Sequence, residues 1–163
     1  MRPSGTMISI FLIAFLALSV QADSSPQTVR VDYYHTGNAN VETLSLQQVV
    51  IEPLPWPGQA EKNIDTTRLG YFLFQVEDPE SGQVLYSRGY SSIFHEWQHT
   101  GEAKQMSRTF HESVRFPKPD KPVRLNILKR NQQQEFVSLW SVPIDTDDML
   151  TVRAHAPAPA PVI

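Results

Sequence analysis

The residues with the clearest chemical potential are five consecutive ones, His95-Glu96-Trp97-Gln98-His99. They match the pattern H-E-x-x-H, in which two histidines one helical turn apart bind zinc and the glutamate acts as a general base. The pattern needs a helical backbone, and a catalytic zinc also needs a third protein ligand. Both conditions can be examined in the surrounding sequence.

The spacing of the two histidines depends on the backbone. In an extended chain, four residues at roughly 3.3 Å each separate His95 and His99 by about 13 Å, too far for one ion. On a helix they are about 6 Å apart and could chelate. A short helix capped by Ser91-Ser92 and ended by Gly101 is one alternative. Because the neighbouring segments alternate as strands do, we expect the extended form, with surface histidines flanking a partly buried Trp97.

The longer zinc motifs are incomplete. The metzincin form requires glycine and histidine where this chain has Glu102 and Gln105. His111 or Glu112 could supply a third ligand, although neither has a known spacing. We therefore assign no catalytic residue, no metal ligand and no cofactor. A small zinc metallopeptidase with His95 and His99 as ligands and Glu96 as base is retained as the alternative.

Three aromatic residues are candidates for binding: Tyr34, Trp56 and Trp97. Trp56 lies in a proline-rich segment, where a stiff backbone lets an aromatic ring bind a sugar or a protein at small entropic cost. The competing interpretation is that Trp56 folds back onto the rim of the domain. A carbohydrate-binding module that uses Trp56 is a further alternative.

Residues 1–22 have the pattern of a secretory signal peptide. Arg2 precedes an apolar run from Met7 to Val20, and Val20-Gln21-Ala22 offers small residues for cleavage. The run has 14 residues, short of the roughly 20 that span a bilayer. We expect a secreted or periplasmic protein without a transmembrane segment in the mature chain. The chain contains no cysteine, so it forms no disulfide.

Charge argues against one class of partner. The chain has 14 Lys and Arg, 17 Asp and Glu and a net charge of −3 at neutral pH, and removal of Arg2 makes the mature charge −4. Nucleic-acid binding would require a basic stripe, and none is present.

Residues 28–150 alternate between apolar and polar side chains with a period of two. In residues 28–34, for example, Val29, Val31 and Tyr33 share one face. Similar segments recur, separated by turns rich in glycine, proline, asparagine and aspartate. This pattern predicts an all-β fold, an antiparallel β-sandwich of the immunoglobulin or jelly-roll kind with seven or eight strands. Residues 154–163 form an Ala/Pro-rich tail or linker that favours an extended polyproline II conformation.

Six segments share one distribution along the chain, and together they span about residues 28–150, nearly all of the mature chain. They are V-D-Y-Y-H-T-G-N at 31–38, V-V-I-E-P-L-P-W-P-G at 49–58, L-Y-S-R-G-Y at 85–90, E-W at 96–97, T-G-E-A-K at 100–104 and F-H-E-S-V-R-F-P at 110–117. In combination they resemble the N-terminal domain of the secreted bacterial IgA-peptidase family of zinc metallopeptidases. So long a set is more specific than a single short motif.

The resemblance implies a β-sandwich that precedes a separate catalytic domain, which carries its own zinc motif. No catalytic residue can be transferred from that domain to this chain. The implied function is that of a non-catalytic accessory domain that mediates protein interaction or positioning. Its partner would be a metallopeptidase catalytic domain in cis or in trans, or a surface protein or glycan.

Overall fold

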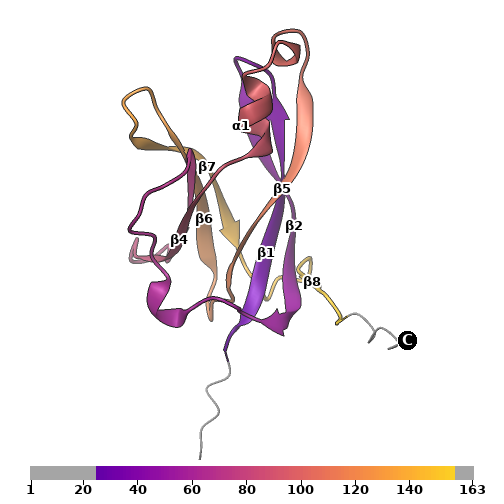
Figure 1. The fold of residues 1–163 in the computed structure, drawn as a ribbon. Helices are drawn as coiled ribbons and strands as arrows, with labels where there is room; N and C mark the ends of the chain where they lie inside the picture. Colours follow the sequence, from indigo (N-terminus) through magenta and orange to yellow (C-terminus); the bar gives the residue numbers. More distant parts are fainter. Residues whose placement is uncertain (1–24, 157–163) are drawn as a thin grey trace, which may run out of the picture.

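The structure is a computed structural model that describes residues 25–156. The predicted signal peptide and most of the Ala/Pro-rich tail lie outside the described residues. Two four-stranded sheets stack face to face (Figure 1), so the predicted β-sandwich is confirmed. One sheet has the order β5-β1-β2-β8 and the other β4-β3-β6-β7.

Strand bounds follow the alternating segments closely. The first sheet contains β1 (Gln27–Gly37), β2 (Glu42–Pro55), β5 (Arg108–Pro117) and β8 (Val152–Arg153), and the second contains β3 (Phe72–Glu77), β4 (Val84–Tyr90), β6 (Val123–Arg130) and β7 (Phe136–Ile144). Short helices η1 (Ala60–Lys62), α1 (Ile93–Gln98) and η2 (Glu102–Lys104) lie in the connections between the sheets. All pairings are antiparallel except that of β8, which runs parallel to β2.

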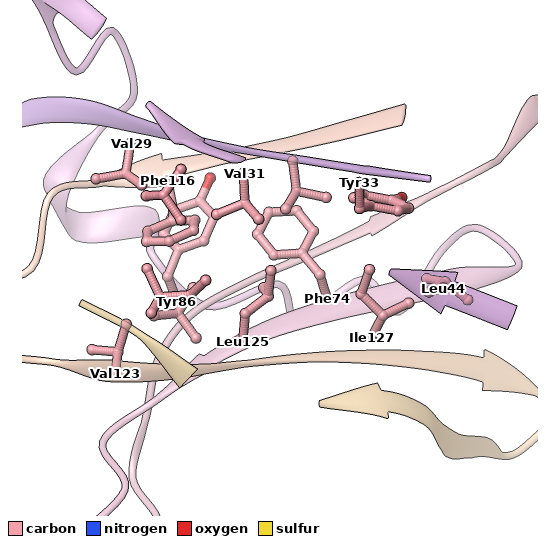
Figure 2. Close-up of a cluster of buried hydrophobic side chains, with 14 of the residues drawn as sticks. Val29, Val31, Tyr33, Leu44, Phe74, Tyr86, Phe116, Val123, Leu125 and Ile127 are labelled. Carbon is pink, nitrogen blue, oxygen red and sulfur yellow. The ribbon is translucent and has the colours of Figure 1, made fainter. Parts of the chain in front are cut away.

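Inward-facing side chains of both sheets form one continuous core (Figure 2). On β1 the fully buried positions Val29, Val31 and Tyr33 follow the predicted period of two. Leu125 and Ile127 of β6 face them from the second sheet and are also fully buried. Burial of this apolar surface, at about 25 cal/mol per Å², is the main term that holds the two sheets together.

Three details differ from the sequence-based expectation. Residues 93–98 are helical rather than extended. Strand β2 continues through Pro53 to Pro55, although the three prolines at 53, 55 and 57 predict a break in regular strand pairing. The additional short strand β8 lies at the edge of β2 and pairs only with Val50 and Ile51. Pro53 falls at an irregularity of the β1–β2 register, so it has no partner on either neighbouring strand. A proline is tolerated in such an edge position because its missing N–H is not needed there.

A glycine is required at position 89 of β4 because another segment of the backbone passes very close to it. A Cβ atom on Gly89 would overlap the carbonyl oxygen of Leu69. The Gly89 amide also donates a hydrogen bond to Asp65 Oδ2 at 2.7 Å. Only glycine fits here, because the loop before β3 lies directly on the β4 backbone.

The assigned core predicts that two leucine-to-alanine substitutions lower the free energy of unfolding by very different amounts. Replacing Leu125, which is fully buried, by alanine should lower the free energy of unfolding by about 2–5 kcal/mol, because a cavity remains. Leu69→Ala removes the same atoms from a side chain that is 70% exposed and should cost less than about 0.5 kcal/mol. Urea unfolding of both variants measures the difference. Equal losses would contradict the assigned core.

Candidate functional site

The H-E-x-x-H segment forms the short helix α1, and the expectation of an extended chain is wrong. Ser92 caps the helix, since its hydroxyl accepts a hydrogen bond from the His95 amide at 3.4 Å. Phe94 is fully buried and stacks on the His35 ring with centroids 3.9 Å apart. Capping and the burial of Phe94 therefore override the local tendency to extend.

The helix brings the two histidine rings together. The ring centroids of His95 and His99 are 4.6 Å apart, with the planes at 80°. His99 Nδ1 donates to the His95 carbonyl oxygen at 2.7 Å. The His95 ring stacks on Tyr71 at 3.6 Å, so its orientation is fixed by the second sheet. Burial and then the nearby His99 and Lys129 lower the pKa of His95, which favours its neutral form.

Neither sequence-based candidate for a third zinc ligand reaches this pair. Glu112 points into the sandwich, where His35, Tyr33 and Ser92 occupy its oxygens. His111 is its neighbour on β5 and therefore faces the other side of the sheet, beside Tyr34. Within residues 25–156, no group of three or more His, Cys, Asp or Glu side chains is placed to hold a metal ion.

The most concentrated set of ionisable groups lies inside the sandwich, around His35. This side chain is 1% exposed. Its Nδ1 lies 3.3 Å from Glu112 Oε2, and its Nε2 lies 3.1 Å from Glu42 Oε2. An imidazole with a carboxylate at each nitrogen satisfies both bonds as a donor only when it is protonated.

Further hydrogen bonds connect this cluster to both sheets and to α1. Glu112 Oε2 accepts from the Tyr33 hydroxyl at 3.1 Å, and Tyr33 in turn meets the Tyr90 hydroxyl at 3.1 Å. Glu112 Oε1 accepts from the Ser92 hydroxyl at 2.6 Å and from the Phe94 amide at 3.3 Å. On the other side, Lys129 of β6 pairs with Glu42. We call His35, Glu42, Glu112, Tyr33, Tyr90, Ser92 and Lys129 the interior polar network.

Pairing shifts the protonation of its members. Burial disfavours the His35 imidazolium, but the hydrogen bonds to Glu112 and Glu42 outweigh it, so the pKa of His35 is raised above 6.5. Burial likewise opposes ionisation of Glu42 and Glu112, yet their bonds to His35 hold the pKa of each below 4.5. Burial also raises the pKa values of Tyr33 and Tyr90, so both stay protonated. All three shifts favour a charged His35 between two ionised carboxylates.

The sequence contained a signal for this network that was not used. His35 continues the inward positions Val29, Val31 and Tyr33 of β1. Glu112 lies between Phe110 and Val114 on the inward face of β5. A histidine and a glutamate at two inward positions require partners. Which residues are the partners could not be known, because Glu42 and Lys129 come from other strands.

The three aromatic candidates do not form one surface. Trp56 is half-buried and packs edge-on against Tyr86 at 5.6 Å, which agrees with the interpretation that it folds back onto the rim. Tyr34 is 39% exposed on the outer face of β1, beside His111. Trp97 of α1 packs on Phe110 at 5.4 Å and donates to Glu102 Oε2 at 2.7 Å.

An apolar surface is present near β8. Met149 and Leu150 are 94% and 81% exposed in the loop between β7 and β8. Leu46 of β2 shares a shallow groove of about 200 Å³ with Leu150, and Val152 is also exposed. We call these four residues the β8 apolar patch. Exposed apolar side chains that gather on one part of a surface are a common feature of protein-interaction sites.

A second groove, of about 520 Å³, lies between the β3–β4 turn and the β5–β6 turn. Its lining includes Leu85, Pro119 and Pro122 together with charged residues of both signs, Asp78, Glu80 and Lys121. The groove contains no histidine and no member of the interior polar network.

Comparison with known proteins identifies the family. The family model described as Peptidase M64 N-terminus matches residues 21–141, most of the chain. The chain belongs to this family. It is the IgA-peptidase-type family, so the resemblance is confirmed at that level, whereas the accessory role remains a prediction. No curated protein matches the sequence.

The described helices are all short. None of those in residues 25–156 is long and apolar enough to cross a membrane.

The interior polar network predicts a distinct pH dependence. Since the folded pKa of His35 lies above 6.5, its stabilising contribution is complete below pH 6.5 and is lost as pH rises through the folded value. The contributions of Glu42 and Glu112 are complete above pH 4.5 and are lost as pH falls through their lowered values. Between pH 4.5 and pH 6.5, His35, Glu42 and Glu112 all stabilise the folded state.

The substitution His35→Gln should isolate the contribution of the charged His35 side chain to the free energy of unfolding. At pH 5.5 it should cost roughly 3–5 kcal/mol, because it breaks a buried charge pair, and the cost should shrink as pH rises through the raised pKa of His35. His111→Gln, on the exposed side of β5, is the control and should show no such trend. Urea unfolding between pH 5 and 9 gives both curves. A cost for His35→Gln that does not vary with pH would contradict the charged state.

Proposed function

We propose that this chain is a non-catalytic accessory domain that positions a peptidase catalytic domain, attached in cis or supplied in trans. The observation that carries the proposal is the family match over residues 21–141. The family description names the N-terminus of a peptidase, which supports a role beside a catalytic domain rather than as one. The function of positioning is supported by two features of the C-terminal end of the sandwich.

The first feature is the fixed exit of the chain from the sandwich. Strand β8 pairs with Val50 and Ile51, and the Ala154 amide donates to the Ile51 carbonyl at 3.0 Å. The Ala/Pro-rich tail begins at this point. An alanine- and proline-rich segment favours a stiff extended conformation, so it acts as a spacer of defined length. A domain joined there would be held in a restricted position.

The second feature is the β8 apolar patch beside that exit. A partner domain tethered nearby is present at a high effective concentration, so even a small apolar contact is formed. The patch is rimmed by Asp145 and Asp148, and a polar rim around an apolar centre is typical of protein interfaces. We therefore propose the patch as the contact surface, in preference to Tyr34, Trp56 or Trp97.

If the β8 apolar patch is the contact surface, a single negative charge introduced there should weaken binding of the partner. Leu150→Asp should weaken binding of a purified catalytic domain of this peptidase family by at least about tenfold, because a carboxylate would have to be buried in the contact. Leu69→Asp places the same charge on another exposed leucine, beside β4, and should leave binding unchanged. Isothermal titration calorimetry measures both. No saturable binding by the wild type would contradict the proposal, and equal weakening by both variants would contradict the patch.

Export is part of the proposal and has its own test. When the full chain is expressed in a bacterium, the exported protein should lack residues 1–22 and begin at Asp23, because small residues at 20 and 22 direct the cleavage. N-terminal sequencing and intact mass of the periplasmic or medium fraction measure this. Retention of the full-length chain in the cytoplasm would contradict it.

A further inference from the structure

The histidines of α1 remain without a role in the proposed function. We propose that His95 and His99 form a two-histidine site for a divalent transition-metal ion of the Cu²⁺ and Zn²⁺ class. Water, or a group of another molecule, would fill the remaining positions. This inference does not depend on a peptidase activity of the chain or on the β8 apolar patch.

The ring geometry fits one shared ion. A metal bound 2.0–2.1 Å from an imidazole nitrogen lies about 3.2 Å from the centre of that ring. When the two metal–nitrogen bonds make an angle of about 90° or slightly more at the ion, the two ring centres are about 4.5–5 Å apart. The centroids of His95 and His99 are 4.6 Å apart without any ion in place. The distance between the two ring centres is therefore compatible with one shared ion.

The hydrogen bonds determine which nitrogens are available. His99 uses Nδ1 to donate to the His95 carbonyl, which leaves the lone pair on Nε2 for a metal. A backbone carbonyl on the other ring nitrogen is the usual partner of a metal-bound histidine. His95 Nδ1 is buried and has no hydrogen-bond partner among the described residues, so Nε2 is the nitrogen of this ring that can reach solvent.

The surroundings hold the two rings in place. His95 stacks on Tyr71 at 3.6 Å and contacts the edge of Phe72 at 6.0 Å. The helix itself is anchored by Phe94 and by Ser92. Preorganisation of this kind reduces the entropic cost of binding. Lys129 lies 5.6 Å from the Tyr71 ring, but its charge is paired with Glu42.

The choice of metal follows from the ligands. Imidazole nitrogens suit copper, nickel and zinc, whereas calcium and magnesium prefer oxygen. Among divalent ions Cu²⁺ binds such sites most tightly, so it is the most sensitive probe. With two protein ligands the site is open, and a third ligand could come from a partner molecule.

The test uses Cu²⁺ alone with the wild-type protein purified without a histidine tag. One ion should bind per chain, and paramagnetic broadening in NMR spectra should affect the ring protons of His95 and His99 before those of His111 and His155. This readout needs no variant. Broadening that begins at His111 or His155, or that affects all four equally, would overturn the proposal.

A pair of variants then tests the spacing. The double variant Glu96→His/His99→Gln keeps the number of histidines but makes the two adjacent, where they do not face each other on a helix. It should bind Cu²⁺ at least about tenfold more weakly, whereas His111→Ala should bind like the wild type. Circular dichroism checks that both are folded. Equal affinity of the folded double variant and the wild type would refute a shared site.

Discussion

A protonated histidine held between two carboxylates inside the sandwich is the constraint on which much of the structure depends. His35 contacts Glu112 at one nitrogen and Glu42 at the other, and Phe94 covers its face. Isolated charges are costly in a protein interior, so each of these groups is tolerated only while the others are in place. The three residues come from β1, β5 and β2, and Lys129 extends the set to the second sheet.

The interior polar network also determines the shape of the H-E-x-x-H segment. Glu112 accepts from Ser92 and from the Phe94 amide at the start of α1, so the helix begins where the network ends. Phe94 then packs against the His35 ring, and His95 is turned toward Tyr71. The spacing of His95 and His99 is thus a consequence of buried charges on other strands. A change in the network should alter α1 before it alters the rest of the sandwich.

The two ends of the molecule have different properties. The α1 end contains the buried charges and the paired histidines, whereas the β8 end has exposed apolar side chains and the fixed exit of the chain. The whole sandwich except its C-terminal edge lies within the match to the peptidase M64 N-terminus family. The proposed positioning function uses the β8 end, and the proposed metal site uses the α1 end. Neither surface contains all three of Tyr34, Trp56 and Trp97.

The fold class and the family could be predicted from the amino-acid sequence alone. These depend on the period-two burial of residues such as Val29, Val31 and Tyr33, which is a local property of each strand. The helical conformation of residues 93–98 could not be predicted in this way, because it depends on contacts with distant residues. His35 lies 58 or more residues before the helix, and Glu112 lies 14 or more residues after it.

The same reason explains the missed network and strand β8. The inward positions of His35 and Glu112 were visible in the alternation, but their partners Glu42 and Lys129 are defined by strand pairing across two sheets. Strand β8 has two residues, too few for any periodic signal, and forms only because β2 presents an open edge. Local pattern fixes which side chains point inward, whereas long-range pairing fixes what they meet there.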